Sequence, residues 1–301
     1  MYFDNFEKYL NEHATGKITL GKSGANVYEL ENTQIAKYVR REFIQSEAAW
    51  ESYGRELQFY LNYASEQFPF LPKIYHCCQT DDEIQLIMEK YHPIDRCNLD
   101  DAMLEKVFDV LTQIHNMPLP AFLPKTNSGA LPLQEDEINQ YLNGWCDVIR
   151  EHSGVFAESD LRKIGEKINT INKHVFSSKE MCCHGDFHFE NLLEDSRGNI
   201  VVCDWQNVNI GHVSGDISFF LSRLSADGVE ISKEKAIQMY CGLSTAGITY
   251  EEIATQMSLS NLNTSFIHWH NYLHGCSVDR VHGIWEKMVE DAEYLYKVCN
   301  M

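Results

Sequence analysis

The sequence has no long apolar run and few basic residues. A membrane-spanning helix needs about 20 consecutive apolar residues, and the 301 residues contain no such run. The N-terminal segment lacks a basic stretch followed by an apolar one, so we expect no signal peptide and a cytoplasmic protein. Only 25 lysines and arginines stand against 44 aspartates and glutamates, which gives a net charge of -19. Because nucleic acids attract basic surfaces, we expect neither a nucleic acid nor a membrane as a partner; the oligomeric state stays open.

The Cys-x-x-Cys spacing is also absent, although the chain has ten cysteines. This absence excludes zinc ribbons and thioredoxin-like redox sites. One local group, formed by Cys182, Cys183, His184 and His188, has the residue types of a metal site. Adjacent cysteines within one loop rarely give tetrahedral geometry, so we reject zinc there and expect mostly small, buried cysteine side chains.

Hydrophobic periodicity divides the chain into two parts of different character. The first 90 residues predict strands around one helix. The predicted strands cover residues 17–20, 27–30, 34–39, 73–78 and 83–89, and the predicted helix covers 46–64. After Tyr91 helices dominate, over residues 101–115, 135–150, 160–175 and 279–298, with a further helix that opens at a Thr249–Glu252 capping box.

A hairpin between residues 181 and 204, with turn residues from Asp195 to Gly198, interrupts these helices. Strands with one helix, followed by helices around a small hairpin, predict an α+β protein. The chain is long enough for two lobes, which we place at residues 1–90 and 91–301.

Three polar residues around this hairpin have the types and the order that phosphoryl transfer needs. Asp186 lies in a loop after an apolar strand, Asn191 follows five residues later, and Asp204 comes directly after a second apolar strand. One carboxylate must orient the attacking hydroxyl, while a second carboxylate and an amide hold Mg²⁺ against the phosphates. Loops at the ends of a hairpin can bring such groups together, so these residues predict a phosphoryl-transfer site.

The segment HGDFHFEN at residues 184–191, followed by DWQ at residues 204–206, resembles the aminoglycoside phosphotransferase and choline kinase-like family, small-molecule relatives of the protein kinases. The resemblance implies a bilobal, protein-kinase-like fold with a small N-terminal antiparallel-sheet lobe and a larger, mainly helical C-terminal lobe. It implies that Asp186 is the catalytic base and that Asn191 and Asp204 bind Mg²⁺.

Two further residues acquire structural roles from the same resemblance. His184 would support the catalytic loop rather than react, and Asp216 would anchor that loop from the next helix. In the N-terminal lobe Gly21, Ser23 and Gly24 resemble the loop that covers the nucleotide phosphates.

The third predicted strand carries Lys37, at the position of the nucleotide-binding lysine of the family. Glu56 resembles its acidic partner on the following helix, and Glu47 at the other edge of the apolar stripe is the rival. Glu89 and Tyr91 fall where the family binds adenine at the hinge between its lobes. The resemblance therefore implies ATP, with GTP as an alternative, and Mg²⁺ as cofactors.

Residues 16–23 also match the phosphate-binding pattern G-x-x-x-x-G-K-S. That pattern works between a buried strand and a following helix. Here the preceding residues 6–14 are helix-like and residues 25–30 predict a strand, so we reject it.

The acceptor is less defined than the nucleotide site. Acidic and aromatic residues in the C-terminal part suggest a cationic, amine-bearing acceptor; the candidates are Glu251, Glu252, Trp269, Tyr272 and Trp285. An aminoglycoside or another antibiotic leads, with antibiotic resistance as its consequence. Choline, ethanolamine, an amino sugar, a neutral sugar or a bulky alcohol are alternatives. A non-catalytic nucleotide-binding pseudokinase is a further one, although Lys37, Asp186 and Asp204 are all retained.

Overall fold

The computed structural model describes residues 5–18, 25–95, 99–124, 132–152, 154–175 and 179–301. The chain forms two compact units. The first unit contains residues 1–124, 181–210 and 219–246, and the second contains residues 125–180, 211–218 and 247–301. This division into units is not the division into lobes that the sequence predicts, so the lobe boundary near residue 90 stays a prediction.

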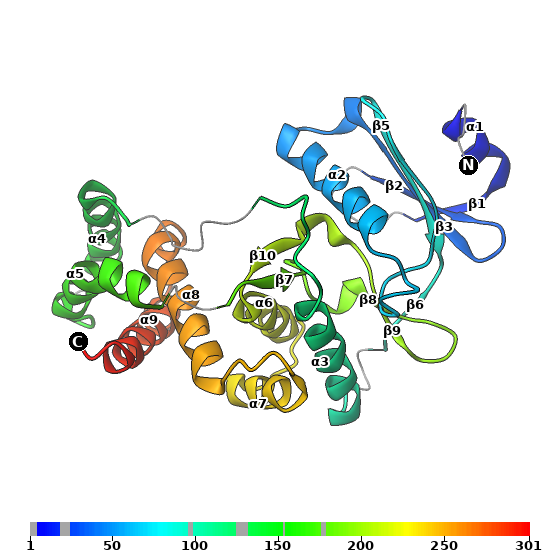
Figure 1. The fold of residues 1–301 in the computed structure, drawn as a ribbon. Helices are drawn as coiled ribbons and strands as arrows, with labels where there is room; N and C mark the ends of the chain where they lie inside the picture. Colours follow the sequence, from blue (N-terminus) through cyan, green and yellow to red (C-terminus); the bar gives the residue numbers. More distant parts are fainter. Residues whose placement is uncertain (1–4, 19–24, 96–98, 125–131, 153, 176–178) are drawn as a thin grey trace. The chain divides into compact units, whose positions relative to one another are not determined.

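The first unit begins with an antiparallel sheet of five strands in the order β1-β2-β3-β5-β4 (Figure 1). These strands are β1 (Ala14–Ile18), β2 (Asn26–Leu30), β3 (Gln34–Arg40), β4 (Ile74–Gln79) and β5 (Glu83–Glu89). In the middle of β3, Lys37 lies opposite Val27 on one side and Leu86 on the other. The short helix α1 (Phe6–His13) packs on this sheet through Phe6 and Leu10.

Helix α2 (Glu47–Asn62) begins where the Ser46 hydroxyl accepts a hydrogen bond from the backbone N–H of Ala49. Most of the side chains that α2 buries are apolar or aromatic, as its periodicity predicts, but Glu56 is buried among them at 3% exposure. A buried carboxylate is costly unless it has a charged partner. The helix ends at Tyr63, whose backbone is extended, close to the end predicted from the sequence.

The central part of the first unit is built from short strands and helices. The strands are β6 (His92–Pro93), β7 (Met181–Cys183), β8 (Leu192–Glu194), β9 (Ile200–Val202) and β10 (Asn209–Gly211). The predicted hairpin is confirmed, because β8 pairs with β9 and Asp195 accepts backbone hydrogen bonds from Arg197 and Asn199 in the turn. The helices are α3 (Asp101–His115) and α7 (Lys233–Leu243), and the first residues of α6 (Val213–Ala226) belong to the second unit.

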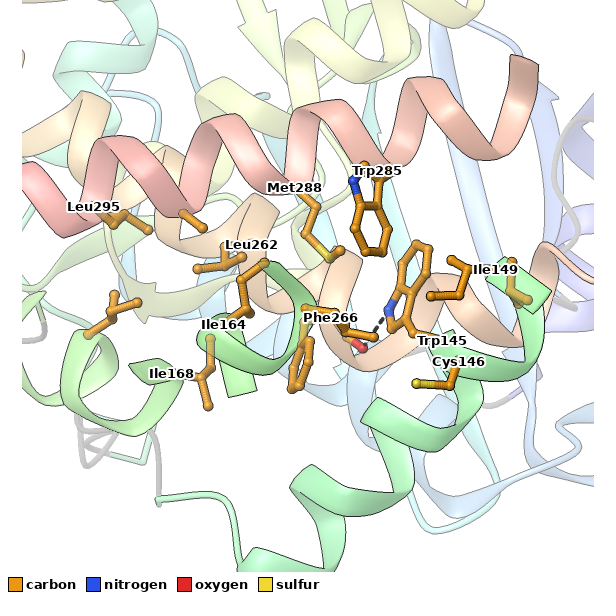
Figure 2. Packing of buried hydrophobic residues seen from close by; sticks show 14 of the residues in the cluster. Trp145, Cys146, Ile149, Ile164, Ile168, Leu262, Phe266, Trp285, Met288 and Leu295 are labelled. Carbon is orange, nitrogen blue, oxygen red and sulfur yellow. Dashed lines mark hydrogen bonds between the residues drawn. The ribbon is translucent and has the colours of Figure 1, made fainter. Parts of the chain in front are cut away.

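The second unit is helical, with a core of its own. Its helices are α4 (Glu135–Arg150), α5 (Glu158–Val175), α8 (Tyr250–His268) and α9 (Val278–Val298). Figure 2 shows Trp145 at the centre of this core, with Trp285 and Met288 of α9 beside it. The Trp145 indole donates to the backbone oxygens of Ser265 and Phe266, which satisfies its polar atom inside the core.

The α+β class predicted from the sequence is confirmed, and so is the capping box of Thr249 and Glu252 at the start of α8. No helix in the described part of the chain combines the length and hydropathy that crossing a bilayer requires.

Candidate active site

One ammonium group lies between two carboxylates in the first unit. Nζ of Lys37 donates to Glu56 Oε2 at 2.7 Å and to Asp204 Oδ1 at 3.1 Å. It also lies 5.2 Å from the centre of the Tyr53 ring. The Lys37 ammonium therefore connects β3, α2 and the residues that follow the β8–β9 hairpin.

The electrostatics of this group keep the lysine charged. Burial opposes the charge, but Glu56 and Asp204 outweigh it and raise the pKa of the Lys37 ammonium well above its usual range. Burial raises the pKa of the Glu56 carboxyl to about 7, against the attraction of Lys37. The lysine therefore remains a fixed positive charge at neutral pH.

Glu47, the rival partner of Lys37, has a different role. It forms an ion pair with Arg41 at the start of α2, where its side chain is 62% exposed. Sequence periodicity placed both glutamates at the edges of the apolar stripe, and the structure brings Glu56 to Lys37.

Asp204 has a backbone conformation that few residues other than glycine adopt. Its φ is 64° and its ψ is 62°, which lies in the left-handed region. Such conformations cost of order 1–3 kcal/mol and gather at functional sites. Gln206 Nε2 donates to Asp204 Oδ1 at 2.5 Å, and the Arg55 guanidinium of α2 donates to the backbone carbonyl of Gln206 at 3.1 Å. The conformation and these contacts fix the direction of the carboxylate.

Asp186 and Asn191 are joined in the loop between β7 and β8. The Asn191 side-chain N–H donates to the Asp186 carbonyl at 2.9 Å, and its Nδ2 lies 3.4 Å from Asp186 Oδ2. The Asn191 carbonyl accepts from the backbone N–H of Cys203, the residue before Asp204. Asn191 and Asp204 therefore lie at the same end of the hairpin.

The His184 ring connects the two sides of this loop. Nδ1 accepts from the backbone N–H of Asp186 at 3.2 Å, and Nε2 lies 3.0 Å from the Cys203 carbonyl, so we assign the proton to Nε2. With both ring nitrogens engaged by backbone groups, His184 has none left for a metal ion. This geometry supports the bracing role predicted from the sequence.

His188 stabilises the ionised form of Asp186. Its Nε2 lies 3.6 Å from Asp186 Oδ1. This contact is the main influence that lowers the pKa of the Asp186 carboxyl, and His184 and Asn191 lower it further. Asp186 is therefore ionised at neutral pH, as a group that orients a hydroxyl must be.

Two residues that sequence reasoning left without a role make this loop possible. Gly185 has a φ of +78°, and a Cβ there would lie 2.1 Å from the Asn207 carbonyl oxygen. Trp205 is fully buried, stacks on Phe59 of α2 at 4.0 Å and donates to the Val202 carbonyl. The sequence does mark both residues: a glycine comes directly before Asp186, and an aromatic residue comes directly after Asp204.

The donor set suits Mg²⁺, which prefers oxygen ligands. Among the described residues, Oδ2 of Asp204 has no hydrogen-bond partner, and the Asp204 side chain is 40% exposed. Asn191 donates through its nitrogen, which leaves its side-chain oxygen available as an acceptor. Asp204 and Asn191 therefore fit the metal that the family resemblance implies.

The other predicted nucleotide residues are less constrained. Gly21, Ser23 and Gly24 lie outside the described residues. Glu89 ends β5 and Tyr91 follows it; the Tyr91 hydroxyl accepts from the backbone N–H of Lys73 at 2.9 Å, so its side chain has a structural contact. Their proposed contact with adenine stays a prediction.

Asp216 lies in the part of α6 that belongs to the second unit, whereas the catalytic loop belongs to the first. Its anchoring role also stays a prediction. The described element that follows the pattern at residues 16–23 is the strand β2, not the helix that a strand-to-helix phosphate-binding turn needs.

The acidic and aromatic residues proposed for the acceptor differ in their surroundings, and the rings of Trp269 and Tyr272 contact each other with their centroids 6.4 Å apart. Glu252 closes the capping box of α8 through Thr249, and Trp285 lies in the core of the second unit (Figure 2). Glu251 is exposed, and the Tyr272 side chain is 69% exposed. Glu252 and Trp285 thus have contacts within the fold, and the cationic character of the acceptor stays a prediction.

A model of the phosphotransferase enzyme family matches residues 18–253 of this chain. The chain belongs to this family. It is thus a phosphotransferase, as the catalytic segment predicted. No curated protein sequence matches it.

Solved structures with the same fold include kinases of several small molecules. An ADP-bound aminoglycoside phosphotransferase matches with a TM-score of 0.55 and 14% identity, over 96% of this chain and 98% of the other. The choline kinase LicA from Streptococcus pneumoniae matches with a TM-score of 0.54 and 14% identity, over 98% and 97%. An ethanolamine kinase from Plasmodium vivax matches with a TM-score of 0.51 and 12% identity, over 91% and 81%. The predicted protein-kinase-like fold is thereby confirmed.

Proposed function

We propose that this phosphotransferase uses ATP and Mg²⁺ to phosphorylate a hydroxyl group of a small molecule. One observation carries the proposal: the Lys37 ammonium is held between Glu56 and Asp204, in the same unit as the Asp186–Asn191 loop. A lysine that stays charged and a carboxylate with an available oxygen provide the two contacts that nucleotide phosphates and their metal need. GTP is the alternative nucleotide.

The residues divide the work by their charge and position. Lys37, oriented by Glu56, binds the nucleotide phosphates. Asp204 and Asn191 hold Mg²⁺, which neutralises phosphate charge when it is bound. Asp186, whose ionised form His188 stabilises, orients the acceptor hydroxyl and receives its proton. Most of the rate enhancement would come from this positioning and charge neutralisation.

The identity of the acceptor is the finer part of the proposal. The names of the solved structures with this fold mention aminoglycosides, choline and ethanolamine, and these proteins share 12–14% sequence identity with this chain. The sequence favoured an amine-bearing acceptor, which would make antibiotic resistance the biological role. Glu252 and Trp285, two of the residues on which that choice rested, have contacts within the fold, so the amine-bearing acceptor stays one of several candidates. A cytoplasmic location is part of this proposal.

The proposal is tested by ATP turnover with a library of small alcohols. Asp186→Asn and Asp204→Asn keep the size of each side chain and remove its charge. Each should lower acceptor-dependent turnover by about 100-fold or more, and Asp186→Asn should leave ATP affinity unchanged. Glu51→Gln, at an exposed glutamate of α2, is the matched control and should keep full activity. Full activity in both aspartate variants would refute the assignment.

A further inference from the structure

The Gln206 side chain lies beside the Asp204 carboxylate, and both ends of its amide have a neighbour. Its Nε2 donates to Asp204 Oδ1 at 2.5 Å, and its Oε1 lies 3.4 Å from the Ser52 hydroxyl of α2. The backbone carbonyl of Gln206 accepts from the Arg55 guanidinium of the same helix. All four residues belong to the first unit. Gln206 is therefore held by α2 on one side while it donates to Asp204 on the other.

The direction of this amide is fixed by the carboxylate. If the amide were turned over, its oxygen would face Asp204 Oδ1, and two acceptors would repel each other. The amide N–H must therefore point at Oδ1. A hydrogen bond from an N–H group to a carboxylate is stronger than one between neutral groups. Gln206 thus has a well-defined and firm contact with one oxygen of Asp204.

The two oxygens of the Asp204 carboxylate differ in their surroundings. A carboxylate oxygen has about two acceptor positions. Oδ1 receives Lys37 Nζ at 3.1 Å and Gln206 Nε2 at 2.5 Å, which fills both of its positions. Oδ2 has no hydrogen-bond partner in the part of the chain that the structure describes. The carboxylate therefore offers Oδ2, and not Oδ1, to a metal ion.

Gln206 differs from Lys37 in what nucleotide binding would do to its contact. Under the proposed function Lys37 also binds the nucleotide phosphates, which can draw its ammonium away from Oδ1. Gln206 is held at its backbone by Arg55 and has no such second ligand, so its N–H stays on Oδ1. A cation that used both oxygens of Asp204 would have to displace this amide and leave its N–H without an acceptor.

Divalent cations differ in how they use a carboxylate. Mg²⁺ demands near-ideal octahedral geometry, whereas Ca²⁺ accepts more oxygen ligands in a flexible arrangement and can take both oxygens of one carboxylate. Asn191 also offers a single side-chain oxygen, because its nitrogen donates to the Asp186 carbonyl. One oxygen from each of Asp204 and Asn191 suits Mg²⁺ better than Ca²⁺.

We propose that Gln206 is a positioning residue that limits Asp204 to coordination through one oxygen and thereby makes the site selective for Mg²⁺ over Ca²⁺. This inference rests on the proposed function, in which Asp204 holds the metal of a bound nucleotide. It gives a role to the last residue of the Asp-Trp-Gln segment at positions 204–206.

Titration calorimetry of ATP into the full chain, in Mg²⁺, in Ca²⁺ and in EDTA, measures the metal preference without relying on turnover. The wild type should bind ATP more tightly in Mg²⁺ than in Ca²⁺. Gln206→Leu removes the N–H from Oδ1. It should raise the ATP affinity in Ca²⁺ relative to that in Mg²⁺ by about tenfold, the effect of one hydrogen bond to a charged group. A wild type that prefers Ca²⁺, or an unchanged ratio of the two affinities in the variant, would overturn the proposal.

Two further variants separate this effect from a general loss of structure. Gln206→Glu keeps the size of the side chain and replaces the donor with a carboxylate oxygen, so it should shift the preference toward Ca²⁺ as well. It decides the question alone if Gln206→Leu does not fold. Gln58→Leu, at an exposed glutamine of α2, is the matched control and should keep the wild-type ratio. A variant that only loosened the fold would weaken ATP binding in both metals equally, and that result would contradict the proposal.

The same titrations separate this inference from the proposed function. If Mg²⁺ strengthens ATP binding through Asp204 and the Gln206 variants shift toward Ca²⁺, both proposals hold. If Asp204→Asn loses the Mg²⁺ effect but the Gln206 variants keep the wild-type ratio, the kinase site stands and this inference fails. If neither metal changes ATP binding to the wild type, both proposals fail.

Discussion

Replacing Lys37 with methionine removes the ammonium group and keeps the length of the side chain. At the observed 2.7 Å, and with an effective dielectric constant of about 20, the attraction between Lys37 and Glu56 amounts to about 6 kcal/mol. Removing both charges from water offsets most of this attraction in the intact pair. Lys37→Met loses the attraction but leaves Glu56 buried at 3% exposure, and such a loss costs about 3–5 kcal/mol.

The cost should depend on pH in a defined direction. The pKa of Glu56 is raised from 4.5 to about 7 by burial, so the folded protein holds this proton more tightly than the unfolded chain. Stability therefore falls as the pH rises from 4.5 through about 7, the pKa of the wild-type carboxyl in the folded protein, and levels off above it. Without Lys37 the pKa of Glu56 rises further, so the fall continues above pH 7. The gap between variant and wild type should widen there by up to about 1.4 kcal/mol per pH unit.

Urea unfolding one pH unit below and one above this pKa measures the effect. Lys8→Met is the control, because Lys8 forms an exposed i,i+4 pair with Glu12 that contributes little. We expect the Lys37→Met deficit to be larger at the higher pH and the control to be near wild type at both. A deficit that is the same at both pH values, or no deficit, would refute the electrostatic reasoning.

Two further predictions concern packing. Gly185→Ala should destabilise the protein by at least about 2 kcal/mol, because the new Cβ meets the Asn207 carbonyl oxygen at 2.1 Å and φ is +78°. Thermal unfolding measures this loss. An unfolding temperature equal to that of the wild type would contradict the close contact between residues 185 and 207. Trp285→Ala should cost about 3–5 kcal/mol, since its ring packs on Trp145 in a core (Figure 2). Tyr272→Ala, at a residue that is 69% exposed, is the control and should change stability by less than about 0.5 kcal/mol. Equal losses of stability in Trp285→Ala and Tyr272→Ala would contradict the placement of Trp285 in the core.

Local patterns in the sequence predicted most of the elements. Apolar residues at helical spacing placed α3 at Asp101–His115 and α4 at Glu135–Arg150. The Thr249–Glu252 capping box marked the start of α8. These signals are local, because a cap and an amphipathic stripe depend on neighbours a few residues away. The division into two units depends on contacts between distant segments, and no local pattern carries it.

The candidate site was predicted in residue type but not in geometry. The motif around Asp186 and the strand position of Lys37 named the chemical groups. The left-handed backbone of Asp204 and the Gln206 contact that orients its carboxylate are properties of the folded chain. Glu252 shows the converse error: its spacing from Thr249 had already assigned it to a helix cap, which made it a poor candidate for ligand binding.

Titration calorimetry of ATP into the wild type and Asp204→Asn, each with and without Mg²⁺, measures whether this aspartate couples the metal to the nucleotide. Asparagine tolerates the left-handed backbone of position 204, so the fold should survive the change. We predict that Mg²⁺ strengthens ATP binding to the wild type and has little effect on the variant. The same Mg²⁺ dependence in both proteins would contradict the assignment of Asp204 as a metal ligand and, with it, the proposed kinase site.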